Sequence, residues 1–212
     1  MSANAKIRVL VADDHAIVRD GIISMLADRD DMEVIAEAAN GQEALAQWET
    51  HRPEVILLDL QMPVRDGLWA IHQIRQQDPT AKIIILTSFD GDEDVYRGLS
   101  AGAMAYLLKD TSGAGLVKSI REVKSGQTCI PPEIAAKLAS RISSPELTQR
   151  EVEILSVLAS GQSNKEIGAA LHISEMTVKD YLKKIFAKLK VVSRTEAVAT
   201  ALRRGIIHPV KK

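Results

Sequence analysis

Short apolar runs alternate with longer amphipathic segments over the first 124 residues. The runs have the length and composition of strands buried on both faces, and they lie at 7–12, 33–38, 55–59, 82–87 and 105–108. The segments between them have helical spacing, at about 15–28, 42–51, 67–77, 91–100 and 113–124. A strand followed by a helix, repeated five times, predicts an α/β fold with a doubly wound, five-stranded parallel sheet.

The pattern changes to helices alone after about residue 145. Four helices are expected near 148–160, 163–170, 174–189 and 193–204. Thr148, Ser163 and Ser193 are each followed three residues later by Glu, which predicts capping boxes, and Ser174 is a fourth N-cap. Because only a few residues join the second and third helices, this all-α part has a helix-turn-helix pattern.

The stretch between the two patterns contains breaks at Gly126 and Pro131-Pro132, with room for a short helix at 133–141. We therefore expect a first domain at 1–124, a linker at 125–144 and a second domain at 145–212. A chain of 212 residues has the length for two small domains, and 46% hydrophobic but only 3% aromatic residues imply aliphatic cores.

Charge divides along the same boundary. Residues 1–144 contain 15 Lys and Arg against 21 Asp and Glu, a balance of −6, whereas residues 145–212 contain 12 against 7, a balance of +5. Chance clustering is the alternative, but such asymmetry suggests that the second part binds nucleic acid.

Targeting signals are not evident in the sequence. Cys129 is the single cysteine, so an internal disulfide is excluded, and the first six residues lack the apolar core of a signal peptide. No apolar stretch approaches the ~20 residues that span a membrane. We expect a cytoplasmic protein.

Polar residues stand at the carboxyl ends of four predicted strands: Asp13 and Asp14, Asp59, Thr87, and Lys109. This edge of an open α/β sheet is where ligands bind. Three carboxylates would repel one another without a cation, and few hard oxygen ligands suit Mg²⁺. A carboxylate can also accept a phosphoryl group, with Lys109 neutralising its charge and Thr87 donating to its oxygens.

Each of these residues also has an ordinary interpretation. One of the two adjacent acids could cap the helix that follows, Lys109 could be solvated, and Thr87 could be a strand-end hydroxyl. The occurrence of the whole set at strand ends favours a common site.

Residues 6–124 resemble the receiver domain of response regulators, which has a flavodoxin-like fold. The matching segments are Val11-Ala12-Asp13-Asp14-His15, Leu58-Asp59-Leu60-Gln61-Met62-Pro63 with Asp66-Gly67, Leu86-Thr87-Ser88 and Tyr106-Leu107-Leu108-Lys109-Asp110. The resemblance implies that a sensor histidine kinase phosphorylates Asp59, and that Thr87 and Lys109 contact the phosphoryl group. It implies that Asp13, Asp14, Asp59 and the backbone carbonyl of Gln61 hold Mg²⁺. Thr87 and Tyr106 would form the conformational switch, although Tyr106 could equally be a half-buried strand residue.

The third helix of the second part has two faces. Val178, Leu182, Ile185 and Leu189 have core spacing, and lysines occupy other positions. The candidate DNA-contacting residues are Thr177, Lys179, Asp180, Lys183, Lys184 and Lys188. A solvated lysine-rich face is the alternative, but the preceding helix-turn-helix spacing favours a recognition helix.

Residues 146–208 resemble LuxR-type helix-turn-helix domains, through segments such as Leu147-Thr148-Gln149-Arg150-Glu151, Ser163-Asn164-Lys165-Glu166-Ile167, Thr177-Val178-Lys179 and Ser193-Arg194-Thr195-Glu196-Ala197. Three positions depart from the pattern. Lys190 replaces a common glycine, Tyr181 a common histidine, and Asp180 places an acid on the presumed groove face, where it could accept from cytosine.

Together the two resemblances identify a NarL/FixJ-type two-component transcription factor. They imply that phosphorylation shifts the receiver and releases or dimerises the DNA-binding domain, that the partners are a histidine kinase, double-stranded DNA and a second copy of the chain, and that the receiver catalyses only its own phosphorylation and dephosphorylation. Two alternatives stay open: a regulator that works without phosphorylation, and an aspartyl-nucleophile phosphatase. The second is disfavoured because Gln61 stands where such enzymes carry an acid.

Overall fold

The computed structural model describes residues 5–208, and the expected domains 1–124 and 145–212 therefore extend at their outer ends beyond the described residues. The chain forms two compact units. One comprises residues up to Phe89 together with Val95–Ala135, and the other comprises Asp90–Asp94 together with residues from Ala136 onward.

The first unit is built on a five-stranded parallel sheet with strand order β2-β1-β3-β4-β5. The strands are β1 (Ile7–Ala12), β2 (Met32–Ala38), β3 (Val55–Leu58), β4 (Ile83–Thr87) and β5 (Ala105–Leu108). Their connections are α1 (Ala16–Ala27), α2 (Gly41–His51), α3 (Gly67–Gln77) and α4 (Asp92–Ser100), and α5 (Gly113–Lys124) follows β5. The α/β prediction is confirmed, with element ends within one residue of those expected.

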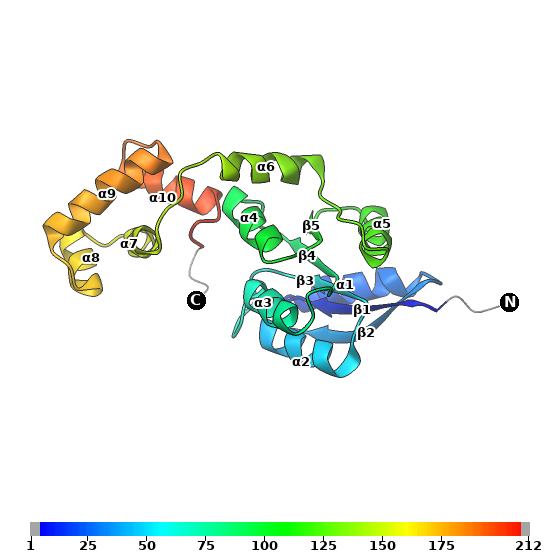
Figure 1. The fold of residues 1–212 in the computed structure, drawn as a ribbon. Helices are drawn as coiled ribbons and strands as arrows, with labels where there is room; N and C mark the ends of the chain where they lie inside the picture. Colours follow the sequence, from blue (N-terminus) through cyan, green and yellow to red (C-terminus); the bar gives the residue numbers. More distant parts are fainter. Residues whose placement is uncertain (1–4, 209–212) are drawn as a thin grey trace. The chain divides into compact units, whose positions relative to one another are not determined.

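Helices cover both faces of this sheet (Figure 1). Successive strand residues point to opposite faces, and on one face Val9, Val11 and Leu57 form a single core with Ile22 and Leu26 of α1 and four residues of α5. Those four residues are Leu116, Val117, Ile120 and Val123. Because β3 and β4 are wholly buried, their runs are continuously apolar rather than alternating.

The second unit contains a bundle of four helices, which are α7 (Gln149–Ala159), α8 (Asn164–Leu171), α9 (Glu175–Leu189) and α10 (Arg194–Arg203). They share one apolar core that includes Ile154, Leu158, Ile167 and Ala197. The prediction of an all-α second part is confirmed. In the expected linker the structure forms α6 (Pro132–Ile142), and the division between the two units falls within this helix.

Side-chain caps start these helices as predicted, with one exception. Thr148 and Ser163 form complete capping boxes with Glu151 and Glu166. At Ser193 the box was predicted wrongly, because the Glu196 carboxylate accepts from the main-chain N–H of Val192, 2.9 Å away, instead of that of Ser193. Ser193 still accepts from the N–H of Glu196 and therefore remains the N-cap.

Candidate functional site

The acids predicted at the strand ends come together at the carboxyl edge of the sheet. Asp13 directly follows β1 and Asp59 directly follows β3, and these strands are hydrogen-bonded neighbours. Both acids are nearly buried, with 2% and 3% exposed surface. The sheet topology thus brings together two carboxylates that are 46 positions apart in the sequence.

Lys109 reaches this pair from the end of β5. Its Nζ lies 2.7 Å from Oδ2 of Asp13 and 2.7 Å from Oδ2 of Asp59. Burial alone would lower the pKa of Lys109, but the hydrogen bonds to the two carboxylates outweigh burial and raise this pKa. The ammonium group therefore stays charged, and it compensates one of the two negative charges that it contacts.

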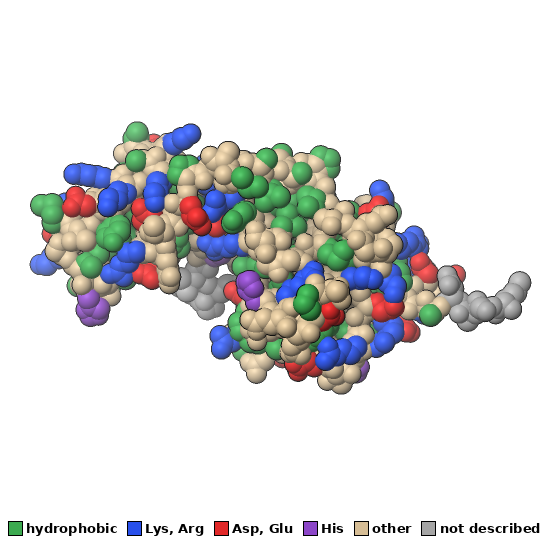
Figure 2. Space-filling view, in the orientation of Figure 1, with side chains coloured by type: hydrophobic (Ala, Val, Ile, Leu, Met, Phe, Trp, Pro, Cys, Tyr) green, Lys and Arg blue, Asp and Glu red, His purple; other side chains and the backbone are tan. Residues whose placement is uncertain are grey.

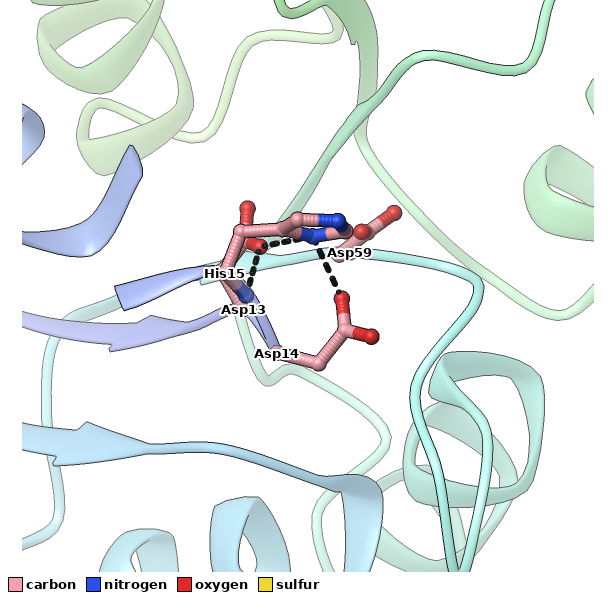
Figure 3. A group of neighbouring side chains, drawn as sticks. All are labelled: Asp13, Asp14, His15 and Asp59. Atoms are coloured by element: carbon pink, nitrogen blue, oxygen red, sulfur yellow. Dashed lines mark hydrogen bonds and ion pairs between the residues drawn. The ribbon is translucent and has the colours of Figure 1, made fainter. Parts of the chain in front are cut away.

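Asp14 and His15 complete the cluster, which Figure 3 shows together with Asp13 and Asp59. The residue that precedes α1 as its N-cap is His15, so the alternative in which Asp13 or Asp14 caps this helix is wrong. Asp13 instead accepts from the main-chain N–H of His15 at 2.9 Å, and Nδ1 of His15 lies 2.7 Å from Oδ1 of Asp14. Sequence reasoning missed His15, although its place directly after Asp13-Asp14 was the available signal.

The donor set fits a divalent cation. Asp13, Asp14, His15 and Asp59 each offer one ligand atom, and these atoms all lie within 4.8 Å of one another. Carboxylate oxygens are the ligands that Mg²⁺ prefers, and a site with few protein ligands leaves positions for water and a phosphoryl group. Lys109 supplies one positive charge and contacts only Asp13 and Asp59. The three carboxylates together therefore carry more negative charge than Lys109 neutralises.

The loop after β3 is held close to the phosphoacceptor candidate by a glycine. A Cβ atom at Gly67 would lie 2.1 Å from the carbonyl oxygen of Asp59, so a larger residue would displace this carbonyl. The main-chain N–H of Gly67 donates to the carbonyl of Leu60, and that of Gln61 lies 3.4 Å from Oδ1 of Asp59. Asp66 caps α3 by accepting from the main-chain N–H of Trp69 at 2.8 Å.

Thr87 and Tyr106 are both tied to Phe89. Thr87 ends β4, is buried, and its Oγ1 accepts from the main-chain N–H of Phe89 at 3.4 Å. The hydroxyl of Tyr106 donates to the carbonyl of Phe89 at 2.7 Å, and the residue is 0% exposed. The alternative that Tyr106 is a half-buried strand residue is therefore wrong, since its ring lies fully inside the unit.

The helix-turn-helix geometry is present in the second unit. The turn after α8 places His172 in the left-handed region, and Ser174 then caps α9 by accepting from Thr177. The positions with core spacing, Val178, Leu182, Ile185 and Leu189, are all buried. This orientation leaves Lys179, Asp180, Lys183 and Lys184 exposed, with Thr177 partly so.

The lysines of α9 differ in their surroundings. Nζ of Lys179 lies 2.8 Å from Glu175 one turn earlier, and Nζ of Lys184 lies 5.7 Å from the ring centre of Tyr181. Nζ of Lys188 lies 2.6 Å from Oε2 of the nearly buried Glu151 in α7, so Lys188 has a structural contact and its DNA contact stays a prediction. Figure 2 shows Lys and Arg side chains spread over this unit with carboxylates among them.

Two family models match this chain. One, described as "Response regulator receiver domain", matches residues 9–121, and the other, "Bacterial regulatory proteins, luxR family", matches residues 145–201. Because the first match alone covers more than half of the chain, the chain belongs to the response regulators of two-component systems. Within that family it joins a receiver domain to a LuxR-type DNA-binding domain, the architecture of a transcriptional regulator.

Known proteins share this organisation over nearly the full length. Response regulator protein VraR of Staphylococcus aureus is 41% identical over 207 residues, which is 95% of this chain and 99% of that protein. The crystal structure of response regulator ChrA from a heme-sensing two-component system is 37% identical, with a TM-score of 0.58 over 96% of this chain and 100% of that chain. Salmonella typhimurium RcsB is 25% identical, with a TM-score of 0.68 over 92% and 98%.

Within residues 5–208, every helix is too short or too polar to cross a bilayer.

Proposed function

We propose that Asp59 accepts a phosphoryl group from a sensor histidine kinase and that this modification controls DNA binding by the second domain. The observation that carries the proposal is the contact of one Lys109 ammonium with both Asp13 and Asp59 at 2.7 Å. An oxygen of the Asp59 carboxylate forms the new bond to phosphorus, and the bond from phosphorus to the kinase imidazole breaks. The chain acts on no separate substrate in this proposal, only on its own acyl phosphate.

Magnesium would be held by Asp13, Asp14, Asp59 and the backbone carbonyl of Gln61. When bound, the ion would neutralise the charge shared by the carboxylates and the phosphoryl oxygens. The support is the gathering of the three carboxylates within 4.8 Å and the preference of Mg²⁺ for oxygen ligands.

Lys109 and Thr87 have separate tasks in this proposal. The ammonium group of Lys109 pairs with a phosphoryl oxygen, because it already contacts the carboxylate of Asp59, to which the phosphoryl group would be attached. The hydroxyl of Thr87 turns toward the same group, which ends its contact with Phe89. Tyr106 holds the carbonyl of the same residue, so a shift of the Phe89 segment passes from Thr87 to Tyr106.

Double-stranded DNA is the proposed ligand of the second domain, with α9 as the recognition helix. Lys179, Asp180 and Lys183 face solvent beside the turn, where side chains reach base edges, and Thr177 and Lys184 flank them. Phosphorylation would release this domain or pair two copies of the chain on adjacent half-sites. We place the receiver at 1–124, the linker at 125–144 and the DNA-binding domain at 145–212, and we place the protein in the cytoplasm.

Substitution of Asp59 by Asn tests the proposed function. The Asp59→Asn variant, incubated with acetyl phosphate and Mg²⁺, should gain no phosphoryl mass in intact-protein mass spectrometry, whereas the wild-type protein should gain one phosphoryl group. Asp110→Asn is the matched control, because Asp110 is an exposed acid near Lys109 outside the cluster. Equal labelling of Asp59→Asn and the wild type would assign the acceptor role to another residue.

A further inference from the structure

We propose that Met176 recognises thymine in the major groove of DNA, by packing its side chain against the C5-methyl group of the base. The inference rests on the proposed function, because it requires α9 to be the recognition helix. It adds an apolar contact to a set of candidate DNA-contacting residues that is otherwise polar.

Met176 lies in the first turn of α9, on the side away from the core of the helical unit. The residue is 66% exposed and directly follows Glu175, at which the helix begins. The buried side of α9 is formed by Val178, Leu182, Ile185 and Leu189. Because successive residues of an α-helix are turned by about 100°, Met176 lies almost opposite to this buried side.

Met176 is the first member of one exposed row along α9. The row continues at the fourth, seventh and eleventh residues after it, all of them exposed, which are Asp180, Lys183 and Ala187. Lys179 lies beside this row and is also exposed. A helix that enters the major groove turns its exposed side to the DNA, and its N-terminal residues meet the base edges. Docking of α9 in the groove would therefore bring Met176 against the bases.

The charges around Met176 favour DNA over an apolar protein surface as its partner. Lys179 and Lys183 lie on the same side of the helix, and only Lys179 has a carboxylate of α9 close by, that of Glu175 at 2.8 Å. An apolar surface that covered Met176 would take these charges out of water without pairing them, which is costly. DNA instead offers phosphates to the lysines and base edges to Met176.

Among the base edges of the major groove, thymine alone offers Met176 an apolar group. Guanine, cytosine and adenine present hydrogen-bond donors and acceptors there, whereas thymine presents its C5-methyl group beside the O4 acceptor. The thioether of methionine is a weak acceptor and donates no hydrogen bond, so Met176 would leave the polar groups of the other bases unpaired. Burial of a methyl group against its flexible, polarisable side chain is favourable.

Exposure alone does not identify a DNA contact, because single apolar side chains are common on protein surfaces. Val192 is 87% exposed, but it follows the C-terminal end of α9, at the opposite end of the helix from Met176. The Val192→Ala variant is therefore the matched control, since it removes an exposed apolar side chain from the same unit outside the row.

Replacement of thymine by deoxyuridine tests the contact, because deoxyuridine lacks the C5-methyl group and keeps the O4 acceptor. The full-length wild type, treated with acetyl phosphate and Mg²⁺, first selects a DNA fragment from a random pool. Each thymine of this fragment is then replaced in turn. Fluorescence anisotropy measures binding of every fragment to the wild type, Met176→Ala and Val192→Ala, all treated in the same way.

We expect one thymine in each half-site at which deoxyuridine weakens wild-type binding about three- to tenfold, the size of effect that burial of one methyl group gives. Met176→Ala should bind the thymine fragment more weakly by at least the same factor, and deoxyuridine at that position should weaken its binding further by less than about twofold. Val192→Ala should match the wild type on both fragments.

Two outcomes would overturn the inference alone: a wild type that binds every deoxyuridine fragment as well as the thymine fragment, or equal discrimination by the wild type and Met176→Ala. Met176→Leu keeps an apolar side chain of similar reach and should retain the discrimination, and it provides the test if Met176→Ala does not fold. The proposed function fails separately, through labelling of Asp59→Asn. Failure of the wild type to select any DNA would overturn both.

Discussion

Nζ of Lys188 lies 2.6 Å from Oε2 of Glu151, which joins the last turn of α9 to the first turn of α7. The same carboxylate accepts from the main-chain N–H of Thr148 at 2.7 Å, as part of the capping box of α7. Burial alone would raise the pKa of Glu151, but Lys188 and Thr148 outweigh burial and lower this pKa. One nearly buried acid thus fixes the start of α7 and, through Lys188, anchors the end of α9.

Loss of this lysine should destabilise the helical unit. We expect Lys188→Ala to reduce the free energy of unfolding by about 1–2 kcal/mol, because it leaves the Glu151 carboxylate nearly buried without its cation, and partial exposure of Lys188 limits the loss. Urea unfolding followed by far-ultraviolet circular dichroism measures the change. Lys184→Ala, an exposed lysine of the same helix, should differ little from the wild type.

The contribution of Glu151 should depend on pH with a definite sign. Because the pKa of this carboxyl is lower in the folded state than in the unfolded chain, its charge stabilises the fold above the ordinary glutamate pKa. The stability difference between the wild type and Glu151→Gln should be constant above about pH 5 and shrink as pH falls through the lowered pKa. Unfolding titrations of both proteins at several pH values provide the test, and a difference that grows on acidification contradicts it.

The residue at the C-terminus of α9, Lys190, has a strained backbone conformation. Lys190 adopts φ 56° at the helix C-terminus, a left-handed conformation that favours glycine. Lys190 therefore adopts a backbone conformation that a glycine at this position would adopt readily. We expect Lys190→Gly to raise the free energy of unfolding by about 0.5–1 kcal/mol, since glycine adopts this conformation without a Cβ clash.

Lys190→Ala is the matched control for that change, because it removes the same charge and keeps the Cβ atom. Thermal unfolding of both variants separates the two causes. Equal stabilisation in the alanine variant would point to charge rather than backbone conformation.

Two exposed lysines should dominate DNA binding. Lys179→Ala and Lys183→Ala should each weaken binding, by about 1–3 kcal/mol with altered sequence preference if a base contact is lost. Loss of a phosphate contact should instead weaken binding to all sequences and reduce the salt slope by about one. Fluorescence anisotropy with selected DNA fragments at several salt concentrations distinguishes these outcomes.

Lys118→Ala is the control for the lysine substitutions, because Lys118 is an exposed lysine of α5 in the first unit. It should bind DNA with the affinity of the wild type. Wild-type affinity in the double variant Lys179→Ala, Lys183→Ala would exclude α9 as the recognition helix.

The local pattern of hydrophobic and polar residues was sufficient to predict the helices and strands and where they end. Buried strands such as Val55–Leu58 appear in the sequence as short apolar runs because both of their faces are covered. The N-caps Thr148, Ser163 and Ser174 were predictable because a hydroxyl satisfies N–H groups only two or three residues away. The exception at Ser193 arose because the Glu196 carboxylate accepts from the main-chain N–H of Val192, the residue before the N-cap. The side-chain conformation of Glu196 decides which N–H it meets, and the spacing of residues does not specify that conformation.

The sequence by itself also determined which residues stand at the strand ends, since parallel strands bring their carboxyl ends to one edge. Only the tertiary structure decided how those side chains pair. Lys109 meets Asp59 from 50 positions away, and Lys188 meets Glu151 from 37. No local period encodes such contacts, because they depend on strand order and helix packing. The complete burial of Tyr106 and the contact of His15 with Asp14 were likewise decided by the tertiary structure. Burial and side-chain direction depend on how the sheet and its loops assemble.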